Sequence, residues 1–188
     1  SEFADFDGAS AKKMSAAGGK IFTSIEESEI PVIAAVNGYA LGGGCELTMC
    51  CHVRIASENA LFGQPEVNLG VPPGYGGTQR LAQIIGRGRA LDMLITAKSI
   101  NAETALDYGL VTQVVTLEEL MPTCIQYVEK LAGKSPLAIA EVIKCTNALY
   151  ENIDGLHYEI DSFSKSFETN DFKEGTTAFI EKRKPKYS

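Results

Sequence analysis

The sequence has no apolar run approaching the roughly 20 residues that a membrane-spanning helix needs, so we expect no membrane partner. It also lacks an excess of positive charge, because 17 lysines and arginines face 24 aspartates and glutamates for a net charge of -7. Broad nucleic-acid binding depends on a concentrated basic face, so we expect no nucleic-acid partner. The basic cluster over residues 181–186 could hold a small anion, although a solvated tail explains it equally well.

The five cysteines fit no standard metal motif. Cys50, Cys51 and His52 are adjacent, but their spacing matches no zinc site and no second such pair accompanies them. We therefore expect no metal and interpret the cysteines as small buried apolar residues. Their odd number indicates a reducing compartment, which predicts the cytoplasm, or the mitochondrial matrix in a eukaryote.

The apolar pattern predicts strands and helices in alternation, followed by helices alone. Residues 8–28 have helical spacing, and the Val- and Ile-rich run over 31–36 is typical of a parallel strand buried on both faces. A capping-box pattern at Thr116–Glu119 and the pair Ser135–Pro136 each predict a helix start. This order predicts an α/β core over 1–115 and a helical region over 116–188. The other predicted elements are a short buried helix over 45–51, strands over 53–56 and 60–62, a loop over 71–77, and mainly helix from Thr78 onward.

Three consecutive glycines, Gly42 to Gly44, stand between a predicted strand and a predicted helix. Glycine lets the backbone approach a ligand closely, and a helix N-terminus presents N–H groups without partners. Together they predict an anion or oxyanion site made of backbone N–H groups, although a tight strand-to-helix turn explains the glycines equally well. No Lys-Ser/Thr pair follows them, which argues against a nucleoside triphosphate site.

Two glutamates are the candidate acid–base residues. Glu46 falls in the first turn of the predicted helix, where the helix dipole alone would favour a carboxylate, but its apolar neighbours predict burial. A buried carboxylate is costly unless it is paired or functional. Glu66 lies on a loop and, taken alone, is an ordinary exposed acid. Two carboxylates and a set of N–H groups would together suit proton transfer beside a carbonyl group.

These segments resemble the enoyl-CoA hydratase/isomerase (crotonase) family, and its hydratases in particular. The resemblance implies an α/β spiral of ββα units with a helical C-terminal region used in trimer formation, hence a homotrimer or a hexamer that is a dimer of trimers. It also implies hydration of an enoyl-CoA thioester to a 3-hydroxyacyl-CoA, or the reverse, with coenzyme A as part of the substrate and no other cofactor. The matching stretches are 31–38, 40–46, 62–66, 73–81, 102–111 and 179–184.

The resemblance implies catalytic roles for four residues. Gly43 matches the glycine whose N–H forms half of the oxyanion hole. Glu46 would activate the water, and Glu66 would exchange the proton at Cα of the substrate. Gly74 matches a glycine whose N–H helps to place that water.

Four further residues are predicted to bind substrate. Gly42 precedes the oxyanion glycine, and Gln64 lies close to the second glutamate. Phe179 and Lys182 match positions that contact the CoA nucleotide, sometimes from a neighbouring subunit. A cation at a helix end is favoured by the helix dipole, which explains Lys182 equally well.

The sequence departs from the family pattern at its start. Family members carry more chain ahead of this point, including an Ala-Gly-Ala-Asp-like segment that supplies the second oxyanion N–H, and residues 1–3 resemble those just after it. We therefore expect a separate N-terminal fragment or a longer parent chain, and weak activity from residues 1–188 alone. Isomerases of the family often keep one glutamate, so the pair favours a hydratase. An isomerase, another crotonase-fold enzyme and a non-catalytic acyl-CoA-binding fragment are the alternatives.

Overall fold

The computed structural model describes residues 7–151 and 153–187, so residues 1–3, with their match to the family pattern, lie outside the described part. The chain forms two compact units. The first joins the described residues up to Glu26 with 32–124, and the second joins 27–31 with the residues from 125 onward. Helix α6 (Leu117–Ala132) begins in the first unit and ends in the second.

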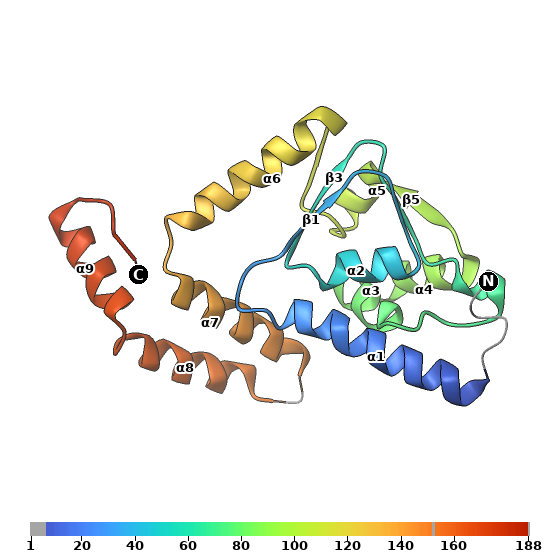
Figure 1. The fold of residues 1–188 in the computed structure, drawn as a ribbon, viewed down its shortest axis with the longest axis horizontal. Helices are drawn as coiled ribbons and strands as arrows, with labels where there is room; N and C mark the ends of the chain where they lie inside the picture. Colours follow the sequence, from blue (N-terminus) through green and yellow to red (C-terminus); the bar gives the residue numbers. More distant parts are fainter. Residues whose placement is uncertain (1–6, 152, 188) are drawn as a thin grey trace. The chain divides into compact units, whose positions relative to one another are not determined.

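Two three-stranded sheets form the frame of the first unit (Figure 1). Strands β1 (Ile33–Val36), β3 (Val53–Ser57) and β6 (Gln113–Val115) make a parallel sheet in the order β1-β3-β6. Strands β2 (Tyr39–Leu41), β4 (Leu61–Gly63) and β5 (Ser99–Asn101) make the other sheet, in which β2 and β4 are parallel and β5 is antiparallel to β4. The chain passes from the first sheet to the second at β1–β2 and again at β3–β4, and helix follows each pair. This is the repeated ββα order that the resemblance predicts.

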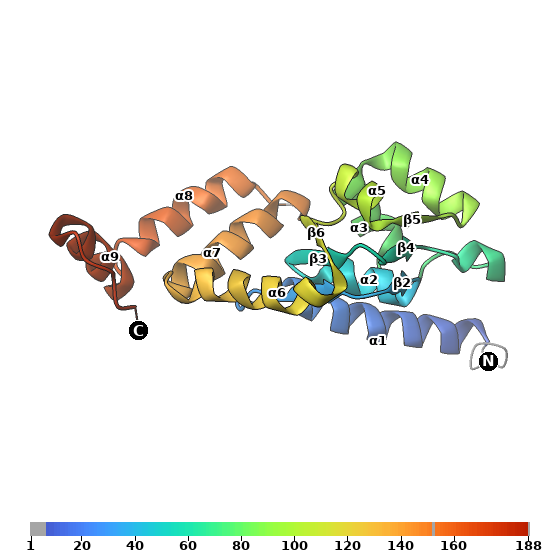
Figure 2. The ribbon, with the colours of Figure 1, turned by 90° about the horizontal axis from the view of Figure 1, so that it is seen from above.

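Helices pack around this frame, and α1 runs alongside α2 (Figures 1 and 2). The helices predicted over 8–28 and 45–51 are confirmed, and the second begins two residues earlier than predicted. Phe62, Leu81 and Met93 are fully buried at the centre of the core. The helices of this unit are α1 (Gly8–Glu26), α2 (Gly43–Cys50), α3 (Gly77–Ile85), α4 (Arg87–Thr96) and α5 (Ala102–Asp107), with a short 3-10 helix, η2 (Glu66–Leu69).

The strands differ from the sequence-based prediction in two respects. In β1 only Val36 is buried and the other three residues are half-buried. Among the described residues β1 is an edge strand, so a neighbouring strand covers it on one side only. Strands β5 and β6 interrupt a stretch that the sequence predicts as mainly helical. A strand of three residues is too short to produce a recognisable alternating pattern.

The second unit contains helices capped by side chains. Ser135, Asp154 and Thr169 each accept a hydrogen bond from the backbone N–H three residues further on, which satisfies a donor that the helix itself leaves unpaired. The helix start predicted at Ser135–Pro136 is thereby confirmed. No helix in the described part of the chain is both long and apolar enough to span a membrane. The elements of this unit are α7 (Pro136–Asn147), η3 (Ala148–Tyr150), α8 (Gly155–Ser166) and α9 (Asn170–Glu181).

Candidate active site

Glu46 is a buried carboxylate held by two backbone N–H groups. It lies in the first turn of α2, is 1% exposed, and has the buried neighbours Cys45 and Met49 on the same helix. Its Oε1 atom accepts hydrogen bonds from the N–H groups of Tyr75 and Gly77, each at 2.8 Å. Among the described residues no donor bonds to Oε2, so the backbone fixes the carboxylate through one oxygen only.

The loop that supplies these N–H groups depends on glycine. Gly76 has a φ of 98°, in the left-handed region, and its backbone turns the chain into α3. A Cβ atom on Gly77 would lie 2.9 Å from Glu46 Oε1, from the Gln64 amide and from Pro73 Cβ. A residue with a side chain therefore cannot bring its N–H to the same place without displacing these neighbours.

Glu66 lies beside the glycine turn at the start of α2. Its Oε1 is 2.9 Å from the position that a Cβ atom on Gly42 would occupy, and Gly42 has a φ of 55°. Gln64 is fully buried, and its amide nitrogen, in the orientation that pairs donor with acceptor, donates to both carboxylate oxygens of Glu66 at 3.0 Å. Burial raises the pKa of Glu66, and the negative charge of Glu46 adds to this rise against a lowering by a backbone N–H.

The N-terminus of α2 presents N–H groups next to both carboxylates. The first bond within this helix runs from Glu46 N to Gly42 O at 2.9 Å, so the N–H groups of Gly43 to Cys45 precede any partner inside the helix. Gly43 also lies against Tyr75, since its Cβ position is 3.8 Å from the ring. An oxygen that gains negative charge could be stabilised at this helix end.

The loop carrying Gly74 is attached to α1. The Ser15 hydroxyl donates to Gly74 O at 2.5 Å, and the rings of Phe22 and Tyr75 meet edge to face with centroids 5.3 Å apart. A Cβ atom on Gly18 would overlap the Tyr75 ring, so this glycine lets the loop lie directly on the helix. Helix α1 thus supports the segment that holds Glu46.

The structure brings six of the eight predicted site residues into the first unit. Phe179 and Lys182 lie in the second unit, at the end of α9 and in its C-cap, and their roles stay predictions. Sequence patterns did not predict the N–H donors Tyr75 and Gly77 or the loop anchor Ser15, because backbone donors and a lone serine give no signal in a sequence. They did not predict Arg80 either, a charged residue directly before the core residue Leu81, and that isolated charge was a usable signal. The six residues of the first unit are Gly42, Gly43, Glu46, Gln64, Glu66 and Gly74.

The cysteine–histidine cluster is occupied by local hydrogen bonds. Cys50 Sγ donates to Glu46 O at 3.1 Å, and burial raises the pKa of its thiol to about 11. His52 Nδ1 accepts from the Val32 N–H at 2.9 Å, and its Nε2 lies 3.2 Å from Glu26 O. Within the described part of the chain, no group of three or more His, Cys, Asp or Glu side chains is placed to hold a metal ion.

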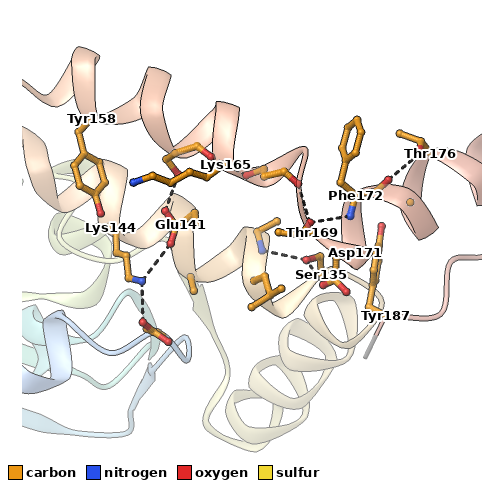
Figure 3. Close-up of a pocket in the computed structure, with 17 residues that line it drawn as sticks. Ser135, Glu141, Lys144, Tyr158, Lys165, Thr169, Asp171, Phe172, Thr176 and Tyr187 are labelled. Atoms are coloured by element: carbon orange, nitrogen blue, oxygen red, sulfur yellow. Dashed lines mark hydrogen bonds and ion pairs between the residues drawn. The ribbon is translucent and has the colours of Figure 1, made fainter.

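A cavity of about 680 Å³ lies in the second unit among α7, α8 and α9 (Figure 3). Its charges pair with one another: Lys144 Nζ lies 2.8 Å from a carboxylate oxygen of Glu29 and 3.2 Å from one of Glu141. Ser162 donates to the second oxygen of Glu141 at 2.7 Å, which lowers the pKa of that carboxyl. None of the predicted site residues lines this cavity, and its paired charges do not mark it as a second candidate site.

The family model described as enoyl-CoA hydratase/isomerase matches residues 4–188. This chain belongs to the enoyl-CoA hydratase/isomerase family. A crotonyl-CoA hydratase of Syntrophomonas wolfei is 50% identical over 179 residues, which cover 94% of this chain and 69% of that protein. A short-chain-enoyl-CoA hydratase of Clostridium acetobutylicum is 46% identical over 186 residues, which cover 98% of this chain and 71% of that protein.

Two solved structures superpose closely on this chain. An enoyl-CoA hydratase from Bacillus anthracis superposes with a TM-score of 0.92 at 38% identity, covering 99% of this chain and 73% of that one. DspI of Pseudomonas aeruginosa superposes with a TM-score of 0.94, also at 38% identity, covering 99% of this chain and 72% of that one. The predicted α/β fold of the crotonase type is thereby confirmed.

Proposed function

We propose that this chain is an enoyl-CoA hydratase, which adds water across the α,β double bond of an enoyl-CoA thioester or removes it from the 3-hydroxyacyl-CoA. One observation carries the proposal: a carboxylate fixed by two N–H groups, Glu46, shares a site with a carboxyl group of raised pKa, Glu66. The names of the two curated relatives, a crotonyl-CoA hydratase and a short-chain-enoyl-CoA hydratase, support the same reaction.

In this proposal the two glutamates divide the proton transfers. Glu46 Oε2 accepts a proton from the water whose oxygen forms the new bond to Cβ of the substrate. The electrons of the double bond shift toward the thioester oxygen, where the N–H of Gly43 stabilises the developing charge. Glu66 then gives its proton to Cα, and a raised pKa keeps more of this carboxyl protonated near neutral pH. Exchange with water resets both groups, so the cycle uses no redox reagent.

The N–H of Gly74 is proposed to help place the attacking water, and Gln64 to orient Glu66. Gln64 suits this role because it is fully buried and donates to both carboxylate oxygens. Phe179 and Lys182 are proposed to contact the CoA nucleotide. These assignments follow the resemblance to family members. They are tested by replacing each residue in turn and measuring KM for the CoA thioester.

The test of the proposed function is hydration of crotonyl-CoA by the wild-type protein and by Glu46→Gln and Glu66→Gln. Each of these variants should lower kcat by about 100-fold or more, because each removes one acid–base group. Glu58→Gln is the matched control, since Glu58 is an exposed glutamate in the same unit, and it should leave kcat unchanged. If the protein isomerises a 3-enoyl-CoA without hydrating it, and if this needs only one of the two glutamates, the protein is an isomerase instead.

We also propose that the protein assembles as a homotrimer or as a dimer of trimers. Several large apolar side chains of the second unit are more than half exposed in the isolated chain, which is unusual for a surface that faces only water. A partner copy would cover such a surface. The residues concerned on α8 and α9 are Leu156, Ile160, Phe163, Phe179 and Ile180.

A further inference from the structure

Arg80 joins helix α1 to the loop that holds Glu46. It lies in α3 and is 9% exposed. Its Nε and Nη2 atoms donate to Glu26 Oε2 at 3.1 and 2.8 Å, and Nη2 also lies 3.2 Å from Thr23 Oγ1. Its Nη1 atom donates to the backbone carbonyl of Tyr75 at 2.8 Å.

Tyr75 is the residue whose N–H donates to Glu46 Oε1. Its carbonyl is fixed by Arg80, and the peptide group that contains its N–H is fixed by the Ser15 bond to Gly74 O. Two consecutive peptide groups are therefore held from outside the loop, which sets the direction of the N–H that reaches Glu46. A guanidinium group is planar and offers several donors at fixed angles, so it can bind a carboxylate and a carbonyl at once, which the single ammonium of lysine does less well.

We propose that Arg80, held in place by Glu26, is a positioning residue for Glu46. It acts through the Tyr75 peptide and keeps the carboxylate at the angle that water activation requires. Arg80 touches neither the reacting water nor the substrate in this scheme. The inference rests on the proposed function, because it assigns Arg80 to the activity of Glu46.

Arg54 provides a matched control inside the same unit. It is half-buried and donates to two backbone carbonyls, from Nε to Leu110 O and from Nη1 to Cys51 O, both at 2.6 Å. Neither carbonyl belongs to the loop around Glu46. The loss of guanidinium hydrogen bonds to backbone carbonyls is therefore common to both variants, whereas a positioning effect on Glu46 should occur only at Arg80.

The experiment compares Arg80→Lys, Glu26→Gln and Arg54→Lys in the wild-type and Glu46→Gln backgrounds. For each variant, kcat and KM for crotonyl-CoA and the midpoint of thermal unfolding are measured. We expect Arg80→Lys to lower kcat by about 10- to 100-fold with a much smaller change in KM, because a small misplacement of a catalytic group has effects of this size. Glu26→Gln should also lower kcat, but by a smaller factor than Arg80→Lys. Arg54→Lys should lower the unfolding midpoint comparably but change kcat less than about twofold.

The Glu46→Gln background separates positioning from general damage. If Arg80 acts through Glu46, Arg80→Lys should add almost nothing to the loss already caused by Glu46→Gln. Losses that multiply in the double variant, or an equal fall in kcat for Arg54→Lys, would overturn the inference while leaving the proposed function intact. Wild-type kcat in Arg80→Lys would overturn it as well. A Glu46→Gln variant with normal hydration would refute the proposed function itself.

Discussion

Gly77 donates its N–H to Glu46 Oε1 at 2.8 Å, and a Cβ atom on Gly77 would lie only 2.9 Å from that same oxygen. The hydrogen bond and the missing side chain are therefore parts of one arrangement. We expect Gly77→Ala to displace the carboxylate and to lower kcat by about 100-fold. Gly19→Ala is the control, because a Cβ atom there meets nothing within 4 Å, and it should keep full activity. Normal kcat in Gly77→Ala would show that the glycine is dispensable.

Ser15 should affect catalysis although it lies on α1. Its hydroxyl donates to Gly74 O, the carbonyl of the same peptide group whose N–H belongs to Tyr75 and binds Glu46. Loss of one hydrogen bond costs about 1 kcal/mol, so we expect Ser15→Ala to lower kcat roughly fivefold. Ser24 donates to Ile21 O within its own helix, so Ser24→Ala should have wild-type kinetics. If Ser15→Ala had the same kinetics as Ser24→Ala, a role of Ser15 in catalysis would be excluded.

The raised pKa of Glu66 can be measured directly by carboxyl-carbon NMR. Burial is its main cause and the charge of Glu46 the smaller one, so the pKa should lie above the ordinary 4.5 in the wild-type protein. It should fall in Glu46→Gln, where the neighbouring charge is absent, but stay above the ordinary value because burial remains. A pKa at or below 4.5 in the wild-type protein would contradict this account of the site.

His52 should make folding stability depend on pH. Burial lowers the pKa of His52 below the ordinary 6.5, and this effect outweighs the rise caused by its backbone hydrogen bonds at Glu26 and Val32. The unfolded chain therefore binds the proton first as the pH falls. The stability contribution is complete above about pH 6.5 and is lost as the pH drops toward the folded pKa. We expect the urea midpoint to fall between about pH 7.5 and 5.5. His52→Gln should flatten this dependence, whereas His157→Gln, at an exposed position, should not.

The proposed assembly depends on apolar side chains of α8. Ile160 is 64% exposed in the isolated chain, and a charge there would face the partner copy. We expect wild-type protein to sediment as a trimer or hexamer and Ile160→Glu to shift it toward monomer. Glu159→Gln changes a neighbouring exposed residue without altering the apolar surface and should sediment as wild type. A monomeric wild-type protein would rule out the proposed assembly.

Sequence patterns predicted the segments of the site better than the bonds between them. The glycine turn into α2 and the burial of Glu46 are local properties, and both are confirmed. The loop predicted over 71–77 is also found, although its last residue, Gly77, already belongs to α3. The bonds from Tyr75 and Gly77 to Glu46 join residues about 30 positions apart and use backbone donors that every residue possesses. Strands β5 and β6 were missed for a related reason, since their pairing partners rather than their own residues make them strands.

The parallel pairing of β2 and β4 has a consequence for how this site tolerates change. Leu41 pairs with Gly63, and each strand leads shortly afterwards to one of the two acids. Neighbouring strands are held roughly 4.8 Å apart by their hydrogen bonds. The distance between the two acids is therefore set by a sheet rather than by a loop. Insertions in surface loops should therefore leave the distance between the two proton-transfer groups unchanged. A slip of one residue between the strands would move Glu66 along by roughly 3.3 Å and separate the pair.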